Sequence, residues 1–150
     1  MNRKTFLIAD DDGQFRQIMV EILLKIYPDD EIKIRHAETG VEAISIFKSC
    51  IKENKPVDVV ITDYAMPEAT GSDVIEFIIN KHPVPIVVVS AVAEAQTHDF
   101  IQEGAIYFLP KPFDIETAKN VVTKALELKV NPDEIQKAKN AIERLKNINS

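Results

Sequence analysis

Five short apolar runs of strand length recur along the chain, and segments with helical periodicity separate them. The runs are Thr5–Ala9, Ile32–Ala37, Val57–Thr62, Ile86–Ser90 and Tyr107–Leu109. In the first two connections, apolar residues recur at helical spacing at Phe15, Ile18, Met19, Ile22 and Leu23, and then at Val41, Ile44, Phe47 and Ile51. Alternation of strand and helix predicts an α/β fold in which helices cover both faces of a mostly parallel, doubly wound sheet.

The composition of individual runs predicts their places in the sheet. The runs that begin at Val57 and Ile86 are almost purely β-branched, as is typical of central strands that are buried on both faces. The run "IKIRHA" alternates apolar and polar residues, so we expect it at or near an edge. Turn residues punctuate the connections, including Gly104 after the expected fourth helix.

The end of the chain carries a strong helix start signal. A fifth helix is expected from about Ile115 to Lys129, and the segment "NPDE" follows it. Asn131 suits the N-cap, Pro132 the first helical position and Glu134 the reciprocal capping position. A further helix should then bury one stripe, formed by Ile135, Ala138, Ile142 and Leu145. We therefore expect one domain, residues 1–130, and a helical extension, residues 131–150, that packs on the body or at a dimer interface.

Composition excludes several classes of protein. A chain of 150 residues with 45% hydrophobic content suits one core rather than two full domains. Its net charge of -6 disfavours binding to a nucleic-acid backbone. Cys50 is the only cysteine, which excludes an internal disulfide and a multi-cysteine metal site and fits the cytoplasm. The N-terminus lacks a signal-peptide core, and no apolar run approaches membrane-spanning length.

Polar and charged residues follow four of the five predicted strands. Asp10, Asp11 and Asp12 follow the first strand, Asp63 the third, Ser90 the fourth and Lys111 the fifth. In an open α/β sheet, ligands bind beyond the carboxyl ends of the strands. Two ionised carboxylates about 4 Å apart repel by roughly 4 kcal/mol at an intermediate effective dielectric, and a divalent cation such as Mg²⁺ would relieve that repulsion.

Each of these residues has an ordinary structural interpretation when it is taken alone. Asp12 is better interpreted as the N-cap of the next helix than as a ligand. Asp63, Ser90 and Lys111 could be a loop residue, a strand-end residue and a surface charge. Together, however, they supply the parts of one site, because Lys111 and Ser90 can bind the oxygens of a phosphoryl group beside a cation.

Four segments resemble the receiver domains of two-component response regulators, the family that includes chemotaxis regulators. They are "LIADDDGQFR", "VVITDYAMPEATGSD", "VVVSA" and "EGAIYFLPKPF", and the resemblance covers roughly Lys4 to Lys129. It implies a flavodoxin-like, five-stranded parallel sheet with strand order 2-1-3-4-5. The additional C-terminal helix lies outside the resemblance.

The resemblance implies a role for each acidic residue. Asp63 would be the phosphoacceptor. Asp11, Asp63 and the backbone carbonyl of Ala65 would bind Mg²⁺, and Asp10 would bind it through water. Ala65 and Val92 fall at two positions that tune dephosphorylation in the family, and neither can orient a water molecule, so slow hydrolysis is expected.

The resemblance also implies the residues that answer phosphorylation. Ser90 and Lys111 would bind the phosphoryl oxygens, and Lys111-Pro112 falls where the family has a cis peptide. Phe108, rather than its neighbour Tyr107, would be the aromatic switch that moves toward Ser90, and core packing is its ordinary alternative. The histidines His36, His82 and His98 have no metal-ligand spacing and are interpreted as structural or solvated.

The sequence thus predicts a cytoplasmic, phosphorylation-controlled switch rather than an ordinary enzyme. A histidine kinase or a histidine phosphotransfer protein would be the phosphodonor. The fourth helix, fifth strand and fifth helix, or the C-terminal helix, could form a homodimer surface, and no membrane, nucleic acid or effector domain is expected. Two alternatives stay open, a small haloacid-dehalogenase-type phosphatase that uses Asp10 and an interaction module that is not phosphorylated.

Overall fold

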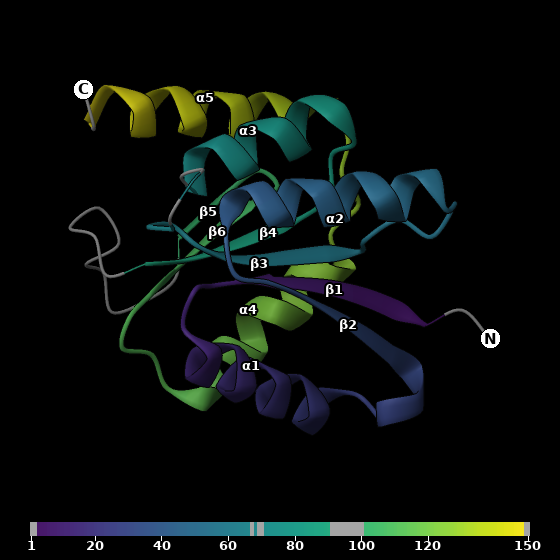
Figure 1. Cartoon of the computed structure of the whole chain (residues 1–150). Coiled ribbons are helices and arrows are strands. Elements are labelled where there is room, and N and C mark those ends of the chain that lie inside the picture. Colours follow the sequence, from purple (N-terminus) through teal and green to yellow (C-terminus); the bar gives the residue numbers. More distant parts are fainter. Residues whose placement is uncertain (1–2, 67, 69–70, 91–100, 149–150) are drawn as a thin grey trace.

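A computed structural model describes residues 3–66, 68, 71–90 and 101–148 of the chain. These residues form a six-stranded sheet and the helices around it (Figure 1). In chain order the elements are β1 (Lys4–Ala9), α1 (Gly13–Ile26), the 3-10 turn η1 (Asp29–Glu31), β2 (Ile32–Ala37), α2 (Gly40–Lys52), β3 (Val59–Asp63), α3 (Gly71–Lys81), β4 (Ile86–Ser90), β5 (Ile101–Glu103), β6 (Ile106–Pro110), α4 (Ile115–Glu127) and α5 (Pro132–Ile148).

The strand order is β2-β1-β3-β4-β6-β5. The first five strands in this order are parallel, and β6 is the strand predicted at Tyr107–Leu109, so the predicted fold class and order are confirmed. Every residue of β4 is buried, which matches its predicted central position, and β2, which is buried only at its two end residues, lies at the edge of the sheet as predicted.

Strand β5 is an addition to the predicted sheet. It pairs antiparallel with β6, and Ile101 lies opposite Phe108 in the register. The sequence interpretation placed Gly104 after a helix, but the described residues just before it, Ile101–Glu103, form this edge strand. Gly104 has φ +62°, a left-handed conformation that ends helices and also makes tight hairpin turns, so the glycine alone did not distinguish the two.

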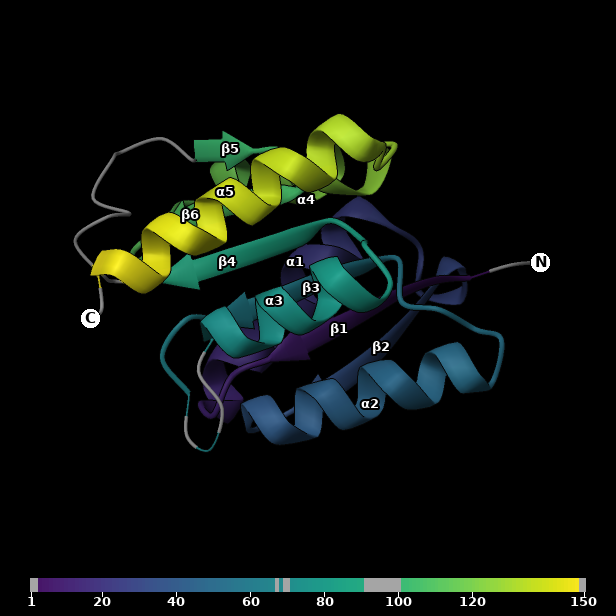
Figure 2. The same ribbon diagram turned by 90° about the horizontal axis from the view of Figure 1, so that it is seen from above.

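Helices cover both faces of the sheet, as predicted. Helices α2, α3 and α5 lie on one face, and α1 and α4 lie on the other (Figures 1 and 2). Successive strand residues point to opposite faces, so Leu7 joins the core under α2 and α3 while Phe6 and Ile8 join the core over α1 and α4.

The C-terminal helix begins as its sequence predicts. The Asn131 side-chain oxygen accepts a hydrogen bond from the Glu134 backbone N–H at 3.1 Å, and Pro132 is the first helical residue. Ala138, Ile142 and Leu145 of the predicted stripe are buried, together with Ala141, in the core of the same chain. Of the two predicted locations for this helix, the structure shows packing on the chain's own body.

Within the part of the chain that the structure describes, no helix is both long and apolar enough to cross a membrane.

Candidate functional site

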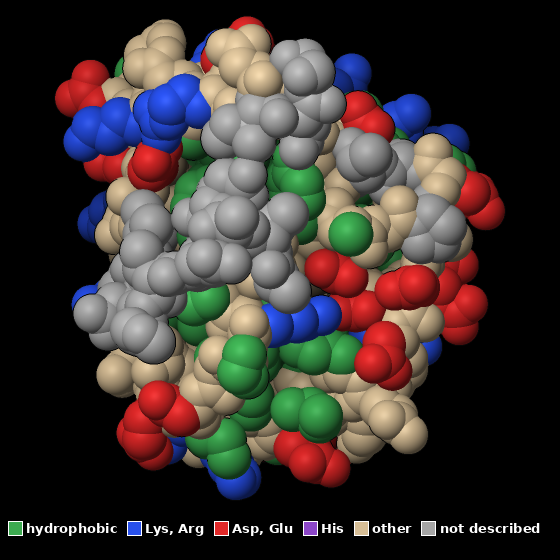
Figure 3. Space-filling model, turned by 90° about the vertical axis from the view of Figure 1, so that its left-hand side faces the viewer, with side chains coloured by type: hydrophobic (Ala, Val, Ile, Leu, Met, Phe, Trp, Pro, Cys, Tyr) green, Lys and Arg blue, Asp and Glu red, His purple; other side chains and the backbone are tan. Residues whose placement is uncertain are grey.

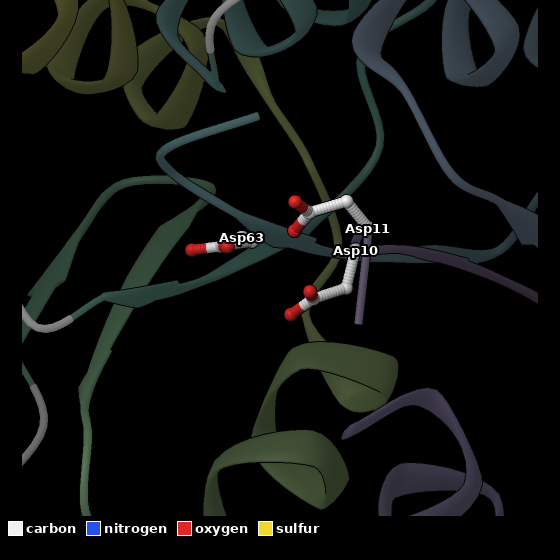
Figure 4. A group of neighbouring side chains, drawn as sticks. All are labelled: Asp10, Asp11 and Asp63. Atoms are coloured by element: carbon white, nitrogen blue, oxygen red, sulfur yellow. The ribbon is translucent and has the colours of Figure 1, made fainter. Parts of the chain in front are cut away.

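Three carboxylates meet at the edge where the parallel strands end. Strands β1 and β3 are neighbours, and Ala9 pairs with Thr62, so the residues that come next in each strand lie side by side. Asp10 and Asp11 therefore face Asp63, and one carboxylate oxygen from each lies within 4.8 Å of the other two (Figure 4). The convergence predicted from the strand ends is thus present in the fold.

Backbone hydrogen bonds fix the first of these carboxylates. The Asp10 N–H donates to the Ala37 carbonyl at 3.0 Å, and the Asp10 Oδ1 accepts from the Asp12 N–H at 2.8 Å. Asp12 turns away from the cluster, because its Oδ1 accepts from the Gln14 N–H at 2.9 Å and caps α1. The interpretation of Asp12 as an N-cap is confirmed.

Lys111 brings a cation to the carboxylates from the end of β6. Its Nζ lies 3.4 Å from Asp10 Oδ2 and 3.9 Å from Asp63 Oδ2. The same Nζ lies 4.3 Å from the centroid of the Phe15 ring, whose face attracts a cation. The Lys111 backbone N–H donates to the Ser90 carbonyl at 2.9 Å, and the Lys111-Pro112 peptide bond is cis, as the resemblance implied.

The negative charges of two of these carboxylates are only partly compensated, because both side chains are largely buried. The Asp10 side chain is 1% exposed and that of Asp63 is 15% exposed. Loss of water raises the pKa of both aspartates above 3.8, and the Lys111 charge opposes that rise only in part. The Asp63 charge further raises the pKa of Asp10, and the Asp11 charge raises that of Asp63. A set of crowded carboxylates whose ionised forms lack compensating charge suits a hard divalent cation.

The residues predicted to sense a phosphoryl group share one face of the sheet. Ser90 ends β4, is 4% exposed, and alternates with Val89, so it points to the same face as Val88. Phe108 lies opposite Val88 in the register and packs half-buried against the core on that face. Tyr107 points to the opposite face, where its hydroxyl donates to the Lys124 carbonyl at 3.3 Å, so only Phe108 shares a face with Ser90.

The loop after β3 places Ala65 next to Asp63. The Ala65 N–H donates to the Asp63 Oδ1 at a long 3.4 Å, and Ala65 is exposed. Gly71 begins α3 against this loop, because its N–H donates to the Tyr64 carbonyl at 2.7 Å and a Cβ on it would lie 2.6 Å from the Tyr64 Cα. Val92, like His98 and the helix expected around it, lies outside the described residues.

The sequence did not predict that Arg16 and Phe15 would lie at the site. The Arg16 guanidinium donates to the Asp10 carbonyl at 2.5 Å and pairs with Glu38 at 3.6 Å, and the Phe15 ring packs under Lys111. One sequence signal could have indicated Arg16, because it is a cationic residue in the first turn of a helix that directly follows three acidic residues. Two of the three histidines lie in the part of the chain that the structure describes. Burial lowers the pKa of His36, and the ring centroids of His82 and Phe47 lie 6.3 Å apart.

Figure 3 looks onto the edge at which the parallel strands end. Acidic side chains gather there beside a basic one, and hydrophobic side chains lie below them, over the ends of α1 and α4. Ile18 of α1 and Ile115 of α4 are 50% and 45% exposed. Acidic, basic and hydrophobic side chains therefore share this edge of the sheet.

The chain matches a protein-family model described as the response regulator receiver domain over residues 6–123. The protein-glutamate methylesterase/protein-glutamine glutaminase of Pyrococcus abyssi is 37% identical over 111 residues, which are 71% of this chain and 28% of that protein. The chain thus spans less than a third of the length of this relative.

Solved structures of receivers share the fold. The response regulator TrrA of Thermotoga maritima, in complex with Mg(2+)-BeF, is 26% identical with a TM-score of 0.62, and the alignment covers 82% of this chain and 99% of TrrA. A chain of the Borrelia burgdorferi CheX-CheY-BeF3-Mg+2 complex is 21% identical with a TM-score of 0.60, and the alignment covers 84% of this chain and 90% of that one.

Proposed function

The chain belongs to the response regulator receiver family, and from that premise we propose that Asp63 accepts a phosphoryl group from a phosphohistidine. The observation that carries the proposal is the convergence of Asp10, Asp11, Asp63 and Lys111 at one strand edge. Receivers are signalling modules, and the activity named for the Pyrococcus relative belongs to a protein of which this chain matches 28%.

The transfer is a displacement at phosphorus. An Asp63 carboxylate oxygen attacks the phosphorus, the bond from phosphorus to the imidazole nitrogen breaks, and the imidazole keeps the electron pair and takes up a proton. The product is an aspartyl phosphate. Asp63 must be ionised to attack the phosphorus. Because burial raises the pKa of Asp63, a nearby positive charge is needed to favour its carboxylate form.

The donors at the site fit Mg²⁺. The Asp10, Asp11 and Asp63 carboxylates and the Ala65 carbonyl would hold it, with Asp10 acting through water. When bound, Mg²⁺ supplies the positive charge that lets a phosphoryl group approach these carboxylates.

Lys111 and Ser90 receive the phosphoryl oxygens. The Lys111 ammonium already lies 3.9 Å from Asp63 Oδ2, so it can pair with the transferred group without a large movement. The Ser90 hydroxyl lies on the face of Phe108, and its contact with the phosphoryl group would draw that ring inward. The arriving group carries roughly two negative charges, which biases the surrounding surface between two states.

A histidine kinase or a histidine phosphotransfer protein is the proposed partner, and the exchange is proposed to occur in the cytoplasm. Exposed hydrophobic side chains lie at the same edge of the sheet as the acidic ones (Figure 3), and they offer an apolar surface on which a histidine-bearing helix can dock. Docking at this edge would bring the phosphohistidine to Asp63.

Labelling with acetyl phosphate tests the proposal. The chain should gain one phosphoryl group in the presence of Mg²⁺, as measured by intact mass, and the Asp63→Asn variant should gain none. Asp12→Asn is the matched control, because asparagine keeps the N-cap of α1 and the charge change is the same. Full labelling of Asp63→Asn, or equal labelling in excess EDTA, contradicts the proposal.

The haloacid-dehalogenase alternative needs Asp10 and Asp12 to act together. The Asp12 carboxylate caps α1 instead of facing the cluster, which disfavours that mechanism. Steady turnover of a phosphate monoester would support the alternative, whereas one labelling event per chain supports the receiver. An interaction module that is not phosphorylated would show neither.

A further inference from the structure

Helix α5 covers part of one face of the sheet. It lies beside α3 on that face, and β5 lies beside α5 (Figure 2).

Helix α5 packs on an apolar surface that we call the β4–β6 face, formed by Ile86, Val88, Ile106 and Phe108. Ile86, Val88 and Ile106 belong to one core cluster, and Phe108 is partly buried against it. The same cluster holds the buried side chains of α5, namely Ala138, Ala141, Ile142 and Leu145. Two of these four are alanines, so the apolar area that fastens the helix is small for its 17 residues.

The turn before β6 fits closely against the start of α5. A Cβ on Gly104 would lie 2.2 Å from the Glu134 carbonyl oxygen and 2.8 Å from the Lys137 Cβ. The first turns of α5 therefore rest directly on the backbone of the β5–β6 turn.

Two ion pairs fasten the far end of α5 to the elements on either side of it. Arg144 pairs with Glu103 of β5, and Lys146 Nζ lies 2.7 Å from the Glu76 carboxylate of α3. Both lysine and arginine are more than 40% exposed, so solvent screens these pairs and they stabilise the contact only weakly.

We propose that α5 is an intramolecular ligand of the β4–β6 face, and that phosphorylation of Asp63 releases it through Phe108. The inference rests on the proposed function. Phe108 connects the proposed phosphorylation site with α5. Its ring packs against the cluster that holds α5, and it lies on the same face of the sheet as Ser90.

The direction of the coupling follows from where Phe108 lies now. In this structure the ring is half-buried and packs against the core cluster that also holds the buried side chains of α5. Movement of the ring toward Ser90 takes apolar surface away from that cluster, so it favours the state in which α5 is undocked. The coupling is reciprocal, and a weaker α5 contact must strengthen binding of the phosphoryl group.

Amide hydrogen exchange of the full chain tests the release. Mg²⁺ with beryllofluoride serves as the phosphoryl mimic, and exchange is followed in peptides from residues 132–148. Exchange in α5 should become at least about fivefold faster on binding of the mimic, the lower end of common allosteric couplings. The Asp63→Asn variant should show no such change. Unchanged exchange in α5, while amides around Asp63 become protected, overturns this inference and leaves the proposed function standing.

Reciprocity is tested with two adjacent substitutions of equal charge change. Ala141→Asp places a charge in the buried stripe, whereas Asn140→Asp places it on the exposed side of the same helix. The first should bind beryllofluoride at least about fivefold more tightly, and the second should bind it as the unaltered chain does. Equal affinity of the two variants contradicts the coupling.

A second pair of variants changes only surface charges, so it tests the coupling without placing a charge in the core. Lys146→Glu sets a negative charge against Glu76 and should raise the affinity for beryllofluoride, and adding Glu76→Lys should restore the original value. Absence of both effects contradicts the inference. If the unaltered chain binds no beryllofluoride and accepts no phosphoryl group, the proposed function fails as well.

Discussion

The Lys111 ammonium has a different neighbour on each side, the Asp10 and Asp63 carboxylates and the face of the Phe15 ring. The strand-end argument predicted the carboxylates and the lysine, because residues that follow neighbouring parallel strands must lie together. It could not predict Phe15 or Arg16, because their contacts depend on how α1 is rotated about its axis, and apolar spacing defines that rotation only coarsely. It also could not show that Asp12 would be withdrawn from the cluster, although N-cap preference favoured that outcome.

Removing one charge from the cluster should stabilise the metal-free fold. Burial raises the pKa of Asp63 in the folded chain above 3.8, so the folded state binds that proton more tightly than the unfolded state does. The contribution of Asp63 to stability is therefore present below 3.8 and is lost as the pH rises through the folded pKa. Near neutral pH in EDTA, Asp63→Asn should melt higher than the unaltered chain, by about 2–4 °C for each kcal/mol of repulsion removed.

Thermal unfolding at two pH values measures this effect. The advantage of Asp63→Asn should disappear below pH 3.8, where the aspartate is protonated in both states, and it should shrink when Mg²⁺ is added. Asp12→Asn, which keeps its cap, should melt like the unaltered chain under all these conditions. A lower melting temperature for Asp63→Asn at neutral pH would show that the Lys111 contact outweighs burial.

At the scale of elements, local signals predicted more than long-range arrangement. The Asn131 cap, the proline at the first helical position and the stripe of α5 all depend on residues within one or two turns. The cap and the proline were correct, and three residues of the stripe are buried, whereas Ile135 is only partly buried. The face that α5 covers depends on which apolar surface the rest of the chain leaves uncovered, and no local pattern encodes that. The β5 strand was missed for a related reason, since Gly104 permits a hairpin as readily as a helix end.

The Gly104 turn should be intolerant of a side chain. Alanine there must adopt φ +62°, which is roughly 1–2 kcal/mol less favourable for a residue with a Cβ, and its Cβ would overlap the Glu134 carbonyl oxygen. Gly104→Ala should lower the free energy of unfolding in urea by at least about that amount. Gly13→Ala is the matched control, because a Cβ there meets only the Arg16 guanidinium at 3.4 Å and should be tolerated. Equal midpoints for both variants would mean that α5 does not rest on this turn.

Considered as a whole molecule, the chain separates the acidic site from the surface that is proposed to respond to phosphorylation. The acidic site lies at the carboxyl edge of the sheet, while α5 covers a face of the same sheet (Figures 1 and 4). Strand β6 connects the two, because Phe108 lies in it and Lys111 follows directly after it. One strand therefore positions both Lys111, which is proposed to bind the phosphoryl group, and the Phe108 ring, which packs against the core cluster that holds α5.

Deleting α5 should destabilise the whole fold, because the helix completes the core over β4 and β6. Truncation after Val130 removes Ala138, Ala141, Ile142 and Leu145 from that core, and burial of one large aliphatic side chain contributes about 1.5–3 kcal/mol before the ordering of the helix is subtracted. The truncated chain should melt several degrees lower, at about 2–4 °C per kcal/mol lost. A chain that ends at residue 148 retains all of α5 and should melt as the full chain does. Light scattering on the same samples reports whether the uncovered β4–β6 face recruits a second copy. Equal melting temperatures and equal masses for the truncated and full chains would show that α5 is not docked in solution, and the proposed release of this helix would then have nothing to act on.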